Sequence, residues 1–256
     1  APWISRKMSY LIDVLGISRE CAKALIIDSA AKLNNGKDVE SSSLIGYVVV
    51  PQKIDDIIFS EDDEIKFLVD GISEKYDTYN YNLPVPMHNG KYPFVAKAVM
   101  CYFPKCSRNQ GVDYTNTELD IGFGRIRDDG TIDTINENHQ TEEGWFTYEG
   151  NARKNYRKWD NVKYIVQPPT SLRKDKEPIG TNKMWGISVK TKERLDNNDG
   201  EGIKFGLVIT LRELHKVNRI ETFIRNCKLN GWLVNPINIE NRIDIYNIAE
   251  EEIEFE

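Results

Sequence analysis

Period-two alternation of apolar residues runs through three segments in the second half of the chain. It is clearest at Leu119, Ile121 and Phe123, and it returns in residues 185–189 and 205–211. Such alternation is typical of a strand with one buried and one solvated face. Together with six further strand-like segments it predicts strands over residues 64–72, 76–83, 94–103, 118–127, 131–135, 145–148, 162–166, 184–191 and 204–211.

The turns between these segments indicate how the strands are connected. Asp129-Gly130 separates two of them and is a strong signal for a β-hairpin. Residues 94–103 are apolar on both faces except at Lys97, as expected of a central strand. Many short strands with such turns favour an antiparallel β-sandwich of the jelly-roll type.

Helical patterns precede the strands. Pro2 suits the first turn of a helix, because its missing N–H has no acceptor there, and Gly16 marks the end of that helix. Ser18 is a suitable N-cap for a second helix, which we expect to end near residues 34–36. The apolar stripe of the first helix consists of Ile4, Met8, Leu11, Ile12 and Leu15, and that of the second of Cys21, Ala22, Leu25, Ile26 and Ala30.

Two shorter helices complete the prediction. One begins at Pro51 and carries Ile54, Ile57 and Ile58, and the other lies between Asn218 and Gly231. The pattern changes from helical to alternating near residue 60. We therefore expect an α+β protein with helices in residues 1–60 and a β-sandwich with one late helix in residues 61–256.

Net charge, the length of apolar runs and the number of cysteines restrict the partners and the cellular compartment that we expect for this chain. The net charge of −6 is spread over segments of mixed sign, which argues against a nucleic-acid partner. No apolar run has the length needed to cross a bilayer, so we expect no membrane partner. Four cysteines are too few for a disulfide scaffold in 256 residues, and reduced thiols fit a cytoplasmic location.

The first sixty residues carry a resemblance in the order of their motifs. Ala1-Pro2-Trp3-Ile4-Ser5 is similar to the end of the G-T-S-x-A-A-P-x-[VI]-[AS] signature of subtilisin-like serine peptidases. Residues 22–30, A-K-A-L-I-I-D-S-A, resemble that family's V-R-A-L-L-x-x-S-A helix. Residues 45–50, I-G-Y-V-V-V, are similar to its G-Y-G-x-V segment, although Val48 stands in place of the second glycine. The resemblance covers roughly residues 1–58.

This resemblance implies a function for the protein to which the chain belongs. The chain would be the carboxyl-terminal part of a subtilisin-like serine endopeptidase, beginning about three residues after the catalytic serine. The Ser-His-Asp triad and the oxyanion asparagine would then lie upstream. The implied partners are a protein or peptide substrate and the upstream catalytic part.

The chain itself offers few candidate catalytic groups. His88, His139 and His215 lie in turn-like or polar segments with no adjacent nucleophile, and G-x-S-x-G is absent. Gly122-x-Gly124 lacks the third glycine of a dinucleotide-binding loop, so we assign it no cofactor. On these grounds no residue of this chain is assigned as catalytic, cofactor-binding or metal-binding.

Acidic and cysteine pairs are better explained as structural or solvated groups. Glu142-Glu143 and Asp128-Asp129 lie beside turn residues, which favours solvated side chains. Residues 196–201 resemble the opening of a calcium loop but have Val208 where the bidentate glutamate belongs. Cys101-x4-Cys106 has the spacing of a metal pair or a hairpin disulfide, yet no second pair with zinc-like spacing accompanies it.

An alternative function is a non-catalytic binding module. Its candidate platform is a set of aromatic residues, Tyr76, Tyr79, Tyr81, Trp145, Tyr148, Tyr156, Trp159 and Tyr164. Core and edge packing is the competing explanation for the same residues. In this alternative the helix pair would dock a partner or a second copy. Whichever function holds, a first helix without the rest of a peptidase domain would leave Trp3, Ile4, Met8, Leu11, Ile12 and Leu15 with little to cover them. We therefore expect the chain alone to be oligomeric or prone to aggregation.

Overall fold

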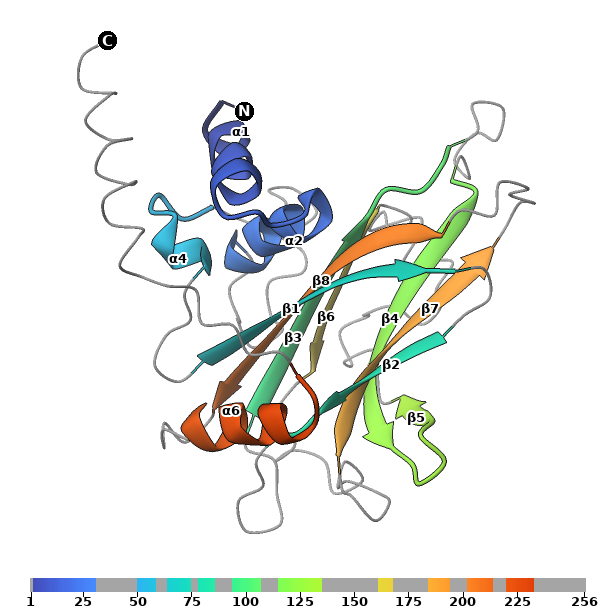
Figure 1. The fold of residues 1–256 in the computed structure, drawn as a ribbon. Helices are drawn as coiled ribbons and strands as arrows, with labels where there is room; N and C mark the ends of the chain where they lie inside the picture. Colours follow the sequence, from blue (N-terminus) through green and yellow to red (C-terminus); the bar gives the residue numbers. More distant parts are fainter. Residues whose placement is uncertain are drawn as a thin grey trace, which may run out of the picture.

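The computed structural model describes ten stretches of the chain. They are residues 2–30, 50–58, 64–74, 78–85, 94–106, 115–134, 161–167, 184–193, 202–213 and 220–232. These residues form helices and two four-stranded antiparallel sheets (Figure 1). The protein is therefore α+β.

The strands agree with the sequence prediction to within a few residues at their ends. They are β1 (Glu64–Ser73), β2 (Thr78–Leu83), β3 (Phe94–Tyr102), β4 (Thr117–Ile126), β5 (Ile132–Thr134), β6 (Val162–Gln167), β7 (Trp185–Glu193) and β8 (Ile203–Glu213). The strand expected over residues 145–148 lies outside the described residues.

The first sheet has the strand order β1-β8-β3-β6 and the second β2-β7-β4-β5. Strands pair as β1 with β8, β2 with β7, β3 with β6 and β4 with β5, which is the pairing of one long hairpin ribbon. Asp129-Gly130 forms the turn at the tip of this ribbon, and Gly130 adopts a positive φ of 80° there. Further pairing of β3 with β8 and of β4 with β7 closes the ribbon into two sheets.

The two sheets share one cluster of buried side chains. β3 is central in the first sheet, as the sequence predicted, and Met100 from it is fully buried. The alternating residues of the second sheet contribute Leu119, Ile121 and Phe123 from β4 and Ile187 from β7 to the same cluster. Burial of each such side chain contributes about 1.5–3 kcal/mol. This shared cluster holds the inner faces of the sheets together.

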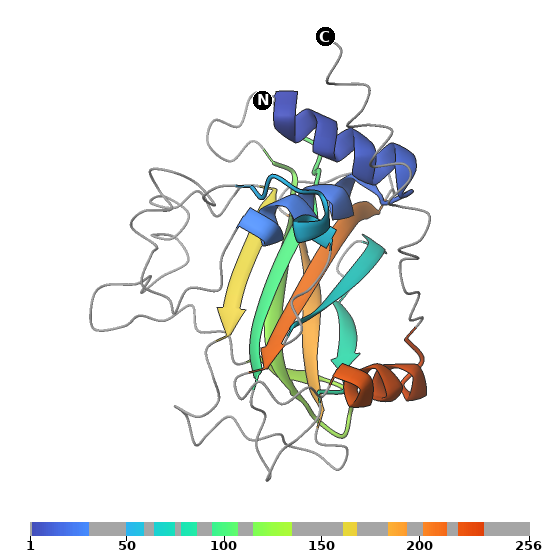
Figure 2. The same ribbon diagram turned by 90° about the vertical axis from the view of Figure 1, so that its left-hand side faces the viewer.

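The helices form two groups, one toward each end of the strands, and α2 of the first group lies on the outer face of the first sheet (Figure 2). At one end lie α1 (Pro2–Ser9), its continuation η1 (Tyr10–Val14), α2 (Arg19–Ala30) and α4 (Asp55–Ile58). At the other lies α6 (Ile220–Leu229). The short helix begins at Asp55 rather than at Pro51, and the expected end of the second helix and the boundary near residue 60 lie outside the described residues.

Helix α6 ends as its sequence predicted. The N–H of Trp232 donates to the Cys227 carbonyl at 3.0 Å and that of Gly231 to the Lys228 carbonyl at 3.2 Å, with Gly231 at a φ of 81°. These are the two bonds of a Schellman motif. The motif places the Trp232 ring 5.4 Å from that of Phe67, so α6 covers the side of the sheets formed by β1 and β2.

Candidate functional site

The amino-terminal helix is the part of the chain to which the resemblance assigns a functional position. Helix α1 begins at Pro2, as predicted, and continues into the π-helical turn η1, where the Leu15 N–H donates to the Tyr10 carbonyl at 3.2 Å. Gly16 ends it with a φ of 66°. Single π turns inside helices are frequent at functional sites.

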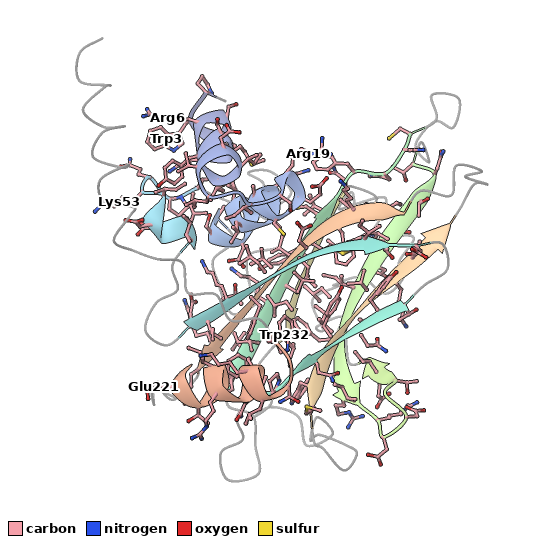
Figure 3. All side chains as sticks on the ribbon, viewed as in Figure 1. Trp3, Arg6, Arg19, Lys53, Glu221 and Trp232 are labelled. Atoms are coloured by element: carbon pink, nitrogen blue, oxygen red, sulfur yellow. The ribbon has the colours of Figure 1, made fainter. Side chains whose placement is uncertain are left out.

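The first turn of α1 exposes large apolar side chains. Trp3, which Figure 3 labels on α1, is 51% exposed, and Ile4 is 44% exposed. Lys7, one turn on, is buried; its ammonium lies 4.7 Å from the Trp3 ring centroid and donates to the Gln52 carbonyl. Burial lowers the pKa of Lys7, and the carboxylate of Asp56 partly opposes this shift. The start of α1 is therefore fixed in position while its apolar surface stays open.

The rest of the stripe is covered, contrary to the expectation for an unpartnered first helix. Leu11 is fully buried, and Met8, Ile12 and Leu15 are half-buried. Leu11 belongs to a cluster built from α2, α4 and the outer face of the first sheet. Its buried members are Leu11, Ala22, Ala24, Leu25, Ile26, Ile54, Ile57, Ile58, Val99, Cys101 and Val208. The expectation was wrong for these residues because α2 and the sheet cover them.

Helix α2 lies very close to the first sheet at Gly206 of β8. A Cβ atom on Gly206 would lie 2.2 Å from the Cys21 backbone nitrogen and 2.6 Å from its Cα. The Cys21 thiol also donates to the Val69 carbonyl of β1 at 3.4 Å. Because the obstacle is helix backbone, only glycine fits at this position.

A buried charge cluster joins the other end of α2 to three strands. We call it the Asp28 cluster, and it consists of Asp28 (α2), Lys66 (β1), Lys97 (β3) and Thr210 (β8). The Lys97 ammonium lies 2.9 Å from Asp28 Oδ1 and donates to the Asp28 carbonyl at 2.7 Å. Thr210 donates to Asp28 Oδ1 at 2.9 Å, and Lys66 Nζ lies 3.5 Å from Oδ2. The Asp28 side chain has no exposed surface.

The electrostatics of this cluster indicate an anchor. Burial lowers the pKa of Lys97, and the attraction of Asp28 opposes the shift. Lys66 also donates to the Ile57 carbonyl at 3.3 Å and so ties α4 to the same point. A buried charge that loses its partner is strongly destabilising, so the cluster fixes α2 on the sheet.

The sequence-derived candidates fall in several places. His88, His139, His215, Glu142-Glu143 and residues 196–201 lie outside the described residues. Asp129 accepts hydrogen bonds from the Thr131 N–H at 2.9 Å and hydroxyl at 2.6 Å, and these bonds lower its pKa. It is an exposed turn residue, as expected of Asp128-Asp129.

The surroundings of the glycine and cysteine candidates indicate structural roles. Gly124 lies within β4, where a Cβ atom would lie 2.4 Å from the Asp133 carbonyl oxygen, so close pairing with β5 explains it. Cys101 is buried and Cys106 is exposed, and both are free thiols. In the described part of the chain, no three His, Cys, Asp or Glu side chains are grouped to hold a metal ion. No helix there is long and apolar enough to span a membrane.

Three of the eight aromatic candidates lie among the described residues. Tyr79 and Tyr81 of β2 pack against the cluster between the sheets, and Tyr164 of β6 packs against the cluster under α2. Burial raises the pKa of Tyr81. Tyr79 and Tyr81 belong to one sheet and Tyr164 to the other, and they pack against different clusters, so the three do not form one platform.

Sequence reasoning missed the Asp28 cluster. One signal was present, because Lys97 was the single charged residue in an otherwise apolar strand. A second signal was Asp28, a charged residue that directly follows four apolar residues of the second helix. Comparison of the chain with protein-family models and with curated proteins gave no match.

Proposed function

We propose that this chain forms the carboxyl-terminal part of a subtilisin-like serine endopeptidase whose Ser-His-Asp triad precedes Ala1. The order of three motifs over roughly residues 1–58 supports this. The proposal assigns no reacting group to the chain and gives it two partners, the upstream catalytic part and a protein or peptide substrate.

One observation carries the proposal. Helix α1 starts at the A-P pair of the signature, and its first turn exposes Trp3 and Ile4 while Leu11 further along is fully buried. An exposed apolar first turn on a helix whose middle is packed at Leu11 is what a missing neighbour would leave. The upstream catalytic part is the neighbour that the motif order implies.

The chemistry follows from the resemblance. A serine just before α1 would be activated by histidine and aspartate and would attack the peptide carbonyl. The amino end of α1 would favour the negative charge that develops on the carbonyl oxygen, because free N–H groups and the helix dipole point toward it. The chain would contribute the position of this helix.

We further propose that residues 61–256 form an accessory jelly-roll domain. The pairing of β1 with β8, β2 with β7, β3 with β6 and β4 with β5 supports it, since a rolled ribbon of eight strands in two sheets is a jelly roll. The helices of residues 1–60 would complete the catalytic domain. We place the protein in the cytoplasm, supported by four free thiols.

The test is hydrolysis of fluorescently labelled casein by the full-length natural polypeptide. We expect cleavage that a serine-directed fluorophosphonate blocks. The control variant replaces the serine three positions before Ala1 by alanine and should show no cleavage. Absence of cleavage by the unmodified polypeptide, or equal cleavage by the control, would contradict the proposal.

A further inference from the structure

Lys7 is a buried lysine close to the exposed start of α1. It is 6% exposed, whereas Trp3, one turn earlier, is 51% exposed. Its ammonium lies 4.7 Å from the Trp3 ring centroid and donates to the carbonyl of Gln52, which belongs to a different part of the chain. Burying a charged group is costly unless the group is paired or hydrogen-bonded. An apolar side chain would fill this position at lower cost, so packing alone does not account for a lysine here.

The segment that accepts this hydrogen bond is itself anchored to the first sheet. Ile54 and Ile57, which follow Gln52, are buried against α2 and the outer face of that sheet. The carbonyl of Ile57 also accepts a hydrogen bond from Lys66 of β1 at 3.3 Å. The bond from Lys7 to Gln52 therefore connects the start of α1 to the sheet through a fixed segment.

Lys7 and Leu11 together hold the direction of α1. They are four residues apart, so they lie on the same face of the helix. Leu11 is fully buried beneath the helix, and Lys7 holds the preceding turn through its hydrogen bond. With both contacts in place the helix axis is held at two points. Without the contact of Lys7 the helix would rest mainly on Leu11 and could tilt about it.

We propose that Lys7 is a positioning residue that sets the direction of α1 and thereby places the nucleophilic serine of the proposed peptidase. This role rests on the proposed function. Counted from the signature, Lys7 lies about 13 Å beyond that serine along a continuous helix, so it touches neither the substrate nor the reacting atoms. It acts through its bond to Gln52 and the direction of the helix. A shift of about 1 Å in a reacting group can lower the rate about 100-fold.

The first test compares the kinetics of Lys7→Met and Lys7→Arg in the full-length natural polypeptide. Active sites are counted on a separate aliquot by complete fluorophosphonate labelling, so that unfolded chains do not enter kcat. We expect kcat per labelled site to fall about 10- to 100-fold in Lys7→Met, with little change in KM for a short peptide substrate. Lys7→Arg keeps a donor for the Gln52 carbonyl and should recover most of kcat.

The matched control is Lys53→Met, the same change at an exposed lysine next to Gln52 (Figure 3). It should keep the kcat of the unmodified polypeptide. A lysine that only stabilised the fold would lower the number of labelled sites in Lys7→Met and leave kcat per labelled site unchanged.

The second test does not depend on activity. Amide hydrogen exchange of residues 4–8 in the full-length polypeptide should be faster in Lys7→Met than in Lys53→Met, and exchange in α2 should be the same in both. An unchanged kcat or an unchanged exchange rate in Lys7→Met would overturn the role of Lys7 alone, as would a Lys7→Arg variant that is equally impaired. An unmodified polypeptide that neither cleaves casein nor takes the label would overturn the proposed function and this role with it.

Discussion

Burial separates the four cysteines into two kinds. Cys21, Cys101 and Cys227 are buried, and Cys106 is exposed. Burial raises the pKa of Cys21 to about 11 and the pKa values of Cys101 and Cys227 to about 12. Because thiolates are the reactive species, the buried thiols are inert at neutral pH.

Thiol titration tests this difference. With a disulfide reagent at pH 8 we expect one fast-reacting thiol per native chain, and none in a Cys106→Ser variant. Denatured chains should show four. Two or more fast thiols in the native protein would contradict the assigned burial.

The same pKa shifts set the sign of a pH effect. A thiol whose pKa is raised in the folded state stabilises the fold below its ordinary value of 9.0. This contribution is lost as the pH rises from 9.0 toward about 12, since the unfolded state releases the proton first. Urea unfolding should show stability falling over this range, and less steeply in a Cys101→Ala variant.

Gly206 tests the close approach of α2 to the sheet. We expect Gly206→Ala to lower the free energy of unfolding by about 3 kcal/mol, because its Cβ would meet the Cys21 backbone. In Gly71→Ala the new Cβ meets the Phe205 ring, a side chain, and we expect about 1 kcal/mol. Urea unfolding measures both, and a neutral Gly206→Ala would place α2 further from β8.

Helix α2 is held by polar as well as apolar contacts. Because Gly206 has no side chain, the Cys21 end of α2 can lie directly against β8. The Asp28 cluster fixes the other end of the helix. These contacts join residues that are 69 and 182 positions apart in the sequence, which makes the helix part of the same packed unit as the strands.

The cluster can be tested by a double-mutant cycle. Lys97→Met should lower the free energy of unfolding by about 3–5 kcal/mol, because the buried carboxylate of Asp28 then loses one of its two lysine partners. Asp28→Asn with Lys97→Met should cost less than the two single losses combined, by about 1–3 kcal/mol. The control is Arg127→Met, which removes a surface ion pair with Asp133 and should cost about 0–1 kcal/mol. Equal losses for Lys97→Met and Arg127→Met would contradict the anchor.

Short sequence patterns predicted most helices and strands. The features that they missed depend on contacts between residues far apart in the chain. The alternation at Leu119, Ile121 and Phe123 and the turn at Gly130 depend on neighbouring residues, so the sequence revealed them. The pairing of β1 with β8 depends on residues far apart, and no local signal encodes it. The stripe of α1 likewise could not tell that Leu11 would be covered and Ile4 exposed.

The candidate site was predictable to a smaller extent. The position of α1 followed from Pro2 and Gly16, both of which act locally. The Asp28 cluster required α2, β1, β3 and β8 to meet, which local patterns do not show. Lys97 was visible as an anomaly in an apolar strand, but its partner was not.

In the whole molecule, α1 lies near one end of the two sheets and α6 lies near the other (Figure 2). The Asp28 cluster fixes α2 on the first sheet, and the buried cluster around Leu11 fixes α1 on α2. In the proposed peptidase, the β domain would thus support the helix that follows the catalytic serine.

Replacing Trp3 tests whether a neighbouring part covers the first turn of α1 in the full-length polypeptide. In this chain alone, Trp3→Ala should change the free energy of unfolding by about 1 kcal/mol or less, because half of the side chain is exposed. In the full-length polypeptide it should cost about 3–5 kcal/mol, since the upstream part would bury the ring. Leu229→Ala should have a small effect in both. Equal small effects of Trp3→Ala in both would count against a covering partner.

The most direct measurement is to label the full-length natural polypeptide with a fluorophosphonate and to identify the modified peptide by mass spectrometry. Trypsin cuts after Arg6, so the account predicts a labelled peptide that ends in A-P-W-I-S-R and carries the probe on the serine three positions before Ala1. Labelling elsewhere, or an active peptidase without labelling at that serine, would contradict it.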